Sequence, residues 1–143
     1  MADTAHGRTS GAPTVFPTVL YEDARAAIRT LTQALGFVEE AVYEGEDGRV
    51  VHAELSLGNG RVMLGSRGRE GAFARAMAGA GPACVYVVLP SADAVDAHHA
   101  RAAAHGMEIL VPPADQEYGS REYLARDAEG NVWSFGTYAP GRA

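Results

Sequence analysis

Two polar side chains that could do chemistry lie close together in one apolar segment of the chain. His52 and Glu54 are two residues apart within residues 50–57, and side chains two apart on a strand point to the same side. Glu122 occupies the related position of a similar segment further along. An imidazole beside a carboxylate can act as a general acid and base, bind a metal ion, or line a binding pocket. The spacing alone leaves these three possibilities open.

Aromatic and polar side chains elsewhere add candidates for ligand contacts. Phe16 and Tyr86 are separated by the repeat distance described below and could stack on a planar group. Tyr118 lies in a short loop segment, residues 116–119, that could close over a ligand. Arg126 and Ser134 fall on the same strand faces as these groups. We therefore expect a half-polar surface that holds a small molecule.

Other reactive residue types have simpler explanations. His98 and His99 are adjacent on a predicted helix, where neighbouring side chains point about 100° apart, so both are expected to be solvated. Cys84 has no basic neighbour in sequence that would lower its pKa, and a small packing residue is the expected role. Trp133 is expected in the core rather than in the site.

The elements that must position these residues repeat. Asp23 and Gly36 bracket a predicted helix, 24–35, with an N-cap and a C-terminal glycine. A predicted strand, 15–20, precedes it, and strands at 37–43, 50–57 and 61–66 follow. A shift of 70 residues lays Gly36 on Gly106 and Gly60 on Gly130. We infer a duplication into units 15–66 and 83–138, joined by 67–82 with a short helix at 72–78.

The turns predict which side chains share a face. Residues 127–130 have the sequence of a type I turn with a following glycine, which pairs Asp127 with Asn131 across a three-residue loop. This register places Trp133 on one face and Ser134 on the other. The same geometry in the first unit places Leu64 beside His52 and Glu54 and turns Met63 to the helix side. Residues 1–13 are small and polar and are expected to be a disordered tail before a single domain, 14–140.

With the two β-α-β-β-β units, the Leu35-Gly36-Phe37 helix stop and the segment from Asp127 to Trp133, the chain resembles the vicinal oxygen chelate superfamily. This superfamily includes glyoxalase I, extradiol dioxygenases and bleomycin-resistance proteins. The resemblance implies an α+β fold in which each unit curls a mixed sheet into half of a cup. It also implies a homodimer, because sheets from two chains commonly complete each cup, although the two half-cups of one chain can also close on each other. The Gly/Ala-rich joint, residues 68–81, favours the dimer because it would let the units splay apart.

Metal-dependent members of the superfamily place ligands at positions that correspond here to Phe16, Leu64, Tyr86 and Ser134. None of these is an imidazole or carboxylate donor. The resemblance is therefore closest to the metal-free, bleomycin-resistance-like branch, which implies binding of a drug or metabolite with no cofactor. The alternative is a glyoxalase-like lyase or isomerase whose divalent metal is held by other ligands, and whether the protein is an enzyme stays open. The expected ligand-binding residues are Phe16, His52, Glu54, Tyr86, Tyr118, Glu122, Arg126 and Ser134.

Composition limits the partners. The 143 residues include 12 Lys+Arg and 18 Asp+Glu, for a net charge of −6. An acidic chain is not expected to bind nucleic acid or an anionic membrane surface, and a cationic or aromatic small molecule suits it better. The longest apolar run, residues 83–89, is far too short to span a membrane, and one cysteine cannot form an intrachain disulfide. We expect a cytoplasmic protein.

Overall fold

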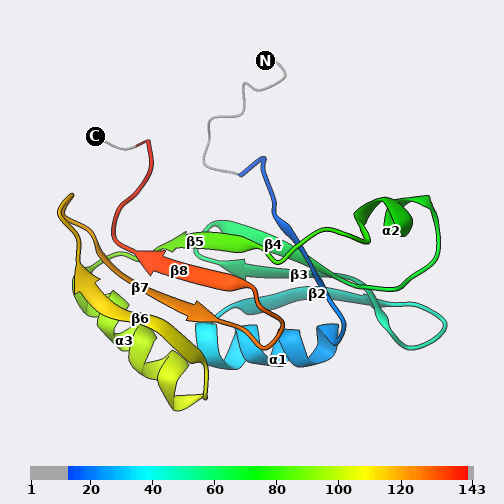
Figure 1. Ribbon diagram of the computed structural model, residues 1–143, viewed down its shortest axis with the longest axis horizontal. Coiled ribbons are helices and arrows are strands. Elements are labelled where there is room, and N and C mark those ends of the chain that lie inside the picture. Colours follow the sequence, from blue (N-terminus) through cyan, green and yellow to red (C-terminus); the bar gives the residue numbers. More distant parts are fainter. Residues whose placement is uncertain (1–12, 142–143) are drawn as a thin grey trace.

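The computed structural model describes residues 13–141, so residues 1–12 of the predicted tail lie outside the described part. Two four-stranded sheets lie side by side, with α1 and α3 on one side and α2 on the other (Figure 1). The first unit contains β1 (Thr18–Tyr21), α1 (Ala24–Leu35), β2 (Val38–Glu44), β3 (Val50–Leu57) and β4 (Gly60–Ser66). The second contains β5 (Cys84–Val88), α3 (Ala92–Ala104), β6 (Glu108–Asp115), β7 (Arg121–Arg126) and β8 (Val132–Gly136). The short helix α2 (Ala72–Met77) lies between them.

Both sheets have the same topology. The strand order is β1-β4-β3-β2 in one and β5-β8-β7-β6 in the other. In each sheet the first strand pairs in parallel with the last, and the remaining pairs are antiparallel. The α+β fold of two β-α-β-β-β units is confirmed. Within residues 13–141, no helix is long and apolar enough to cross a membrane.

The second hairpin has the predicted register. Tyr123 pairs with Phe135 and Ala125 with Trp133, and all four side chains are fully buried beneath the helices. Asp127 accepts from the backbone N–H groups of Glu129 and Asn131 across the turn. The placement of Trp133 in the core is thus confirmed.

The predicted register of the first hairpin is wrong. Leu57 pairs with Gly60 and Ala53 with Leu64, so only residues 58 and 59 form the turn. Gly58 has a φ of 61°, which a two-residue turn between strands favours. A slip of one residue turns every side chain of a strand to the other face. Leu64 is therefore in the core, and Met63 lies opposite Glu54 on the outer face.

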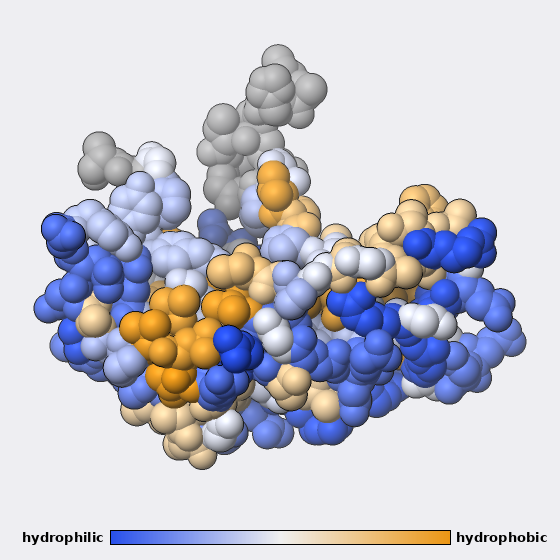
Figure 2. Space-filling model, in the orientation of Figure 1, coloured by the Kyte–Doolittle hydropathy of each residue, from blue (hydrophilic) through white to orange (hydrophobic). Residues whose placement is uncertain are grey.

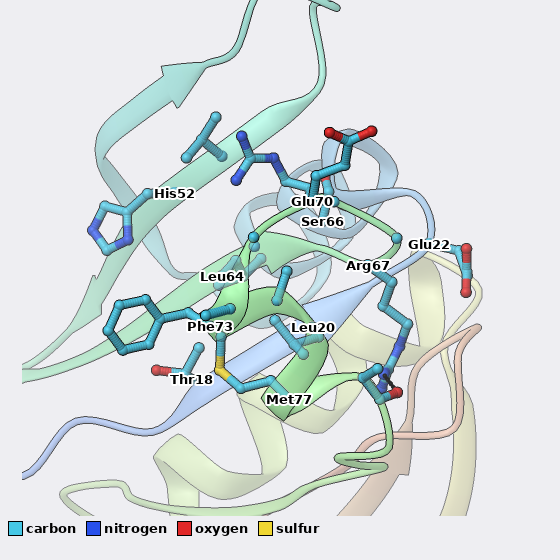
Figure 3. A pocket seen from close by; sticks show the side chains of 18 residues that line it. Thr18, Leu20, Glu22, His52, Leu64, Ser66, Arg67, Glu70, Phe73 and Met77 are labelled. Carbon is cyan, nitrogen blue, oxygen red and sulfur yellow. Dashed lines mark hydrogen bonds between the residues drawn. The ribbon is translucent and has the colours of Figure 1, made fainter.

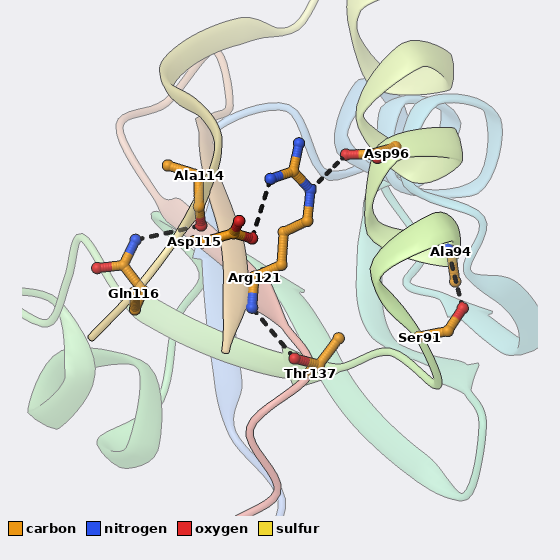
Figure 4. Close-up of polar contacts among 8 residues, drawn as sticks. All are labelled: Ser91, Ala94, Asp96, Ala114, Asp115, Gln116, Arg121 and Thr137. Carbon is orange, nitrogen blue, oxygen red and sulfur yellow. Dashed lines mark hydrogen bonds and ion pairs between the residues drawn. The ribbon is translucent and has the colours of Figure 1, made fainter. Parts of the chain in front are cut away.

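Helix boundaries follow the capping residues. Asp23 accepts from the N–H of Ala26, and Gly36 ends α1 in the left-handed conformation, as predicted. In the second unit the cap is Ser91 rather than Asp93, because the Ser91 side chain accepts from the N–H of Ala94 (Figure 4). The first strand begins at Thr18 rather than Val15. The preceding Pro17 has no N–H to donate to a neighbouring strand.

Side chains of α3 hold the two units together. The ring of His98 donates from Nε2 to the Leu35 carbonyl at 2.8 Å and accepts at Nδ1 from the Tyr123 hydroxyl at 2.6 Å. We assign this tautomer because a carbonyl can only accept. Arg101 donates to the carbonyls of Thr32 and Gln33 at the end of α1. The prediction that His98 is solvated was wrong, because this face of α3 packs against α1 and the second sheet.

A buried carboxylate ties the second hairpin to the first unit. Asp127 accepts from the Tyr21 hydroxyl at 2.7 Å and from the indole N–H of Trp133 at 3.1 Å. Both partners are fully buried. Burial, together with the Asp127 carboxylate, raises the pKa of Tyr21 far above its usual value, so the phenol remains a donor.

We expect Asp127→Ala to reduce the free energy of unfolding by about 3 kcal/mol or more, since it leaves several buried donors without an acceptor. Chemical denaturation measures this. Asp115→Ala, which removes an exposed partner of Arg121 (Figure 4), is the control and should cost less than about 1 kcal/mol. Equal effects of the two substitutions would contradict the structural role of Asp127.

His98 should make stability depend on pH. Burial lowers the pKa of its imidazole below the usual value, with Arg101 acting in the same direction. The unfolded chain therefore binds more protons than the folded one as pH falls through about 6.5, and stability falls with it. We expect His98→Gln to flatten the decline of melting temperature between pH 7.5 and 5.5. His105 is exposed, and the control His105→Gln should show the same decline of melting temperature as the wild-type protein. The same decline in His98→Gln would refute the role given to His98.

Candidate functional site

A cavity of about 570 Å³ lies between the first sheet and α2 (Figure 3). Strands β1, β3 and β4 form its floor, and the connection from Arg67 to Ala78 forms its cover. Its polar lining consists of Thr18, Glu22, His52, Ser66, Arg67, Arg69 and Glu70, and its larger apolar side chains are Leu20, Val51, Leu64, Phe73 and Met77. The lining is thus mixed in character, with apolar and polar side chains on both the floor and the cover.

The cover is held by one arginine. Arg67 donates to the carbonyls of Ala78 and Ala80, at 3.4 Å and 2.7 Å. A side chain at Gly81 would approach the Arg67 guanidinium to 2.7 Å, so this glycine makes the contact possible. Helix α2 itself has no buried residue, and Phe73 is 85% exposed. The cover therefore offers apolar groups that the described residues leave largely unpacked.

His52 and Glu54 meet as their spacing predicted. The imidazole Nε2 donates to the Glu54 carboxylate at 3.0 Å, and Arg61 donates to the other carboxylate oxygen at 2.8 Å. The ring of Tyr43 stacks on His52. The hydrogen bonds from His52 and Arg61 lower the pKa of Glu54, so it is an ionised and already neutralised group. Of the pair, His52 lines the cavity.

Arg61 and Met63 were missed at the sequence level. The three-residue turn assumed for the first unit placed them on the wrong face, whereas the observed pairing of Glu54 with Met63 brings both to the outer face. The signal was present in Gly58-Asn59, which favours a two-residue hairpin turn.

A second group of side chains gathers on the other sheet. The Tyr118 hydroxyl donates to Glu122 at 2.8 Å, and the Tyr86 hydroxyl donates to the Tyr138 carbonyl at 2.7 Å. A side chain at Gly136 would come within 2.6 Å of both Glu122 and the Tyr86 hydroxyl, so this glycine gives them room. Burial raises the pKa of Tyr86, and the hydrogen bond to Glu122 raises that of Tyr118.

The remaining predicted residues are more scattered. Ser134 pairs with Tyr86 and Leu124 in the second sheet. Arg126 is half-exposed at the end of β7 and pairs with Glu108 at 3.3 Å. Phe16 precedes β1, is 38% exposed and does not line the cavity. The predicted residues thus form two groups, one on each sheet, and Phe16 makes no ring contact with Tyr86 in the described chain.

Cys84 is exposed on β5, contrary to the expected packing role. The strand lies at the edge of its sheet, paired only with β8. Nothing in the described part of the chain covers this face of the residue.

Comparison with known proteins identifies the family. The model of the glyoxalase/bleomycin resistance protein/dioxygenase superfamily matches residues 15–135. The chain belongs to this superfamily. The resemblance drawn from the sequence is confirmed.

Relatives agree with this assignment. The crystal structure of TioX from Micromonospora sp. ML1 is 30% identical, with a TM-score of 0.67, and covers 88% of this chain and 100% of TioX. A superfamily protein from Nocardioides shares the fold at 21% identity, with a TM-score of 0.64, over 94% of this chain and 89% of its own. An uncharacterised protein of Mycobacterium tuberculosis is 28% identical over 128 residues, covering 87% of this chain and 74% of that protein.

The metal that enzymes of the superfamily use does not fit the donors of this chain. Tyr86 pairs with Ser134 in the second sheet, and the matching pair in the first sheet is Thr18 with Met63. Thr18 and Met63 therefore take the places that the sequence assigned to Phe16 and Leu64. Neither residue supplies an imidazole or a carboxylate. Within residues 13–141, no three or more His, Cys, Asp or Glu residues group so that they could hold a metal ion. His52 and Glu54 lie on one sheet and Glu122 on the other.

Proposed function

We propose that the protein binds a small organic molecule in the cavity between the first sheet and α2, and that it does so without a metal ion. The cavity carries this proposal. Its volume of about 570 Å³ lies within the range of about 300–1,000 Å³ that is typical of small-molecule sites. Its lining of apolar and aromatic side chains with polar groups among them also matches the usual composition of such sites.

The cover suggests how the ligand is held. Phe73 and Met77 are exposed at 85% and 38% although both line the cavity. An apolar or aromatic ligand packed against Phe73 would remove this surface from water, which is favourable at about 25 cal/mol per Å². His52, Thr18 and Ser66 would then orient the ligand through hydrogen bonds.

The His52–Glu54 pair can contribute to binding. His52 and Arg61 both stabilise the charged form of Glu54, which lowers the pKa of this carboxyl. The pair is suited to hold a polar group of the ligand in place, and the drug or metabolite concerned would be sequestered unchanged, in the cytoplasm.

We further propose that two chains pair. The two groups of polar side chains lie on different sheets, and the cavity involves only the first sheet and the connection. Strands β1 and β5 are at sheet edges, and such edges are usually covered in native assemblies. Figure 2 shows hydrophobic surface on the part of the molecule where Figure 1 draws the second sheet. On the edge strands of that sheet, Val88 of β5 and Val111 of β6 are 42% and 41% exposed. A second copy would cover part of this surface and bring the two sheet faces together.

A ligand screen with metal analysis tests the proposed binding. We expect purified protein without stoichiometric zinc, nickel or iron to show a raised melting temperature with one or more aromatic compounds, and this shift should persist after treatment with a chelator. Phe73→Ala should weaken binding of such a compound about tenfold, since it removes one large apolar contact.

Arg75→Ala is the matched control for this experiment. Arg75 lies on the same exposed helix but does not line the cavity, so binding should be unchanged. A tightly bound stoichiometric metal whose removal abolishes the ligand shift would overturn the metal-free proposal. Chelator-sensitive turnover of the hemithioacetal of methylglyoxal and glutathione would instead support the glyoxalase-like lyase.

Light scattering at micromolar concentration tests the pairing of chains. We expect a mass of twice the 15.0 kDa of one chain. Val88→Asp, which places a charge on the edge strand β5, should lower this mass toward one chain without unfolding the protein, as checked by circular dichroism. A wild-type mass of one chain, unchanged by added ligand, would refute the pairing.

A further inference from the structure

Glu122 is a half-buried carboxylate without a cationic partner. Among residues 13–141 it forms no ion pair with an Arg or His side chain. One carboxylate oxygen accepts from the Tyr118 hydroxyl at 2.8 Å. The other carboxylate oxygen and the Tyr86 hydroxyl both lie close to Gly136. A Cβ atom at Gly136 would come within 3.1 Å of this oxygen and 2.6 Å of the hydroxyl. The charge is therefore hydrogen-bonded but not neutralised.

Several other carboxylates of the sheets pair with an arginine. Glu54 on the first sheet pairs with Arg61 and His52. On the second sheet Arg121 pairs with both Asp96 and Asp115 (Figure 4), and Arg126 pairs with Glu108. Arg121 is adjacent to Glu122 in sequence, but successive side chains of a strand point to opposite faces. The arginines of this sheet are thus directed to other acids, and the charge of Glu122 is left on the outer face.

Three tyrosines that contact one another form a group beside this charge. The rings of Tyr118 and Tyr138 meet edge to face with centroids 6.0 Å apart, and they are 63% and 49% exposed. Tyr86 completes the group through its hydrogen bond to the Tyr138 carbonyl. Aromatic faces attract organic cations through the ring quadrupole, and a carboxylate forms a stronger hydrogen bond with a charged donor than with a neutral one. We call Tyr86, Tyr118, Glu122 and Tyr138 the tyrosine cluster.

We propose that the tyrosine cluster binds the ammonium group of an organic cation, with Glu122 as the counter-ion and the tyrosine rings as the walls. This inference rests on the proposed function, because it adds a charged subsite on the second sheet for the organic ligands that the protein is proposed to bind. A metal ion is a poorer occupant, since a single carboxylate with protonated phenols is a weak donor set.

Benzylammonium and benzyl alcohol are the test probes, because they have nearly the same shape and differ in charge. We expect NMR titration of the full-length protein at neutral pH to show tighter binding of benzylammonium, with shifts at Tyr118, Glu122 and Tyr138. Glu122→Gln keeps an acceptor for Tyr118 but removes the charge, and should weaken benzylammonium binding about tenfold or more while leaving benzyl alcohol unaffected. Tyr118→Leu, which removes one ring, should weaken it by a smaller factor.

Glu108→Gln is the matched control. It removes one negative charge from the same sheet at an exposed ion pair with Arg126, so it tests whether net charge alone attracts the probe. We expect binding at the wild-type level. The cation site is refuted if Glu122→Gln binds benzylammonium as wild-type protein does, or if Glu108→Gln weakens it equally.

The two proposals fail in different ways. Probe-induced shifts at Phe73 and His52 with no preference for the ammonium would leave the cavity as a binding site and remove the cation site. A preference for the ammonium that depends on Glu122, with no compound affected by Phe73→Ala, would keep the cation site and remove the cavity. If Glu122→Gln fails to fold, as judged by circular dichroism, the effect of Tyr118→Leu and the location of the wild-type shifts decide the matter.

Discussion

The arrangement of the two units depends on the buried carboxylate of Asp127. Its oxygens accept from the Tyr21 hydroxyl of the first unit, the Trp133 indole and the backbone of its own turn. The same turn carries Glu129, which accepts from the N–H groups of Glu22 and Asp23 just before α1. A buried charge of this kind is tolerated only when it is fully hydrogen-bonded. This turn therefore helps to fix the relative position of the sheets, together with the contact between α1 and α3 and the packing of Phe37 against Trp133.

The helices and this turn join the two units on one side of the sheets. The other faces of both sheets are therefore left open. Helices α1 and α3 contact each other on one side, and the chain must cross between the units on the other. The crossing segment, residues 67–82, passes over the first sheet (Figure 1) and encloses the cavity. The cavity is thus a consequence of how the repeat is connected. Within residues 13–141, this connection covers the face of the first sheet and not that of the second.

The sequence predicted the repeat and the second hairpin because their signals are local. Asp23, Gly36 and the segment from Asp127 to Gly130 each act through nearby backbone groups. The register of the first hairpin was predicted wrongly because a glycine at either end of the turn is compatible with two loop lengths. The choice between them depends on burying Val62 and Leu64 in the tertiary structure. The predicted solvent exposure of His98 was wrong for a related reason, since its hydrogen-bond partners are 25 and 63 residues away in the sequence. The cavity was not predicted, because it depends on the path of residues 67–82.

The two units have kept the same core and diverged on their outer faces. Core positions retain large apolar or aromatic groups in both sheets, including Leu55 in one and Tyr123 in the other. On the outer faces, the acid of the first unit is neutralised by Arg61, whereas Glu122 of the second is surrounded by tyrosines. The exposed ion pair of Glu54 with Arg61 contributes little to stability, so the stability of the fold does not explain the asymmetry of the outer faces. The binding of an organic cation by the second sheet, as proposed above, would explain it.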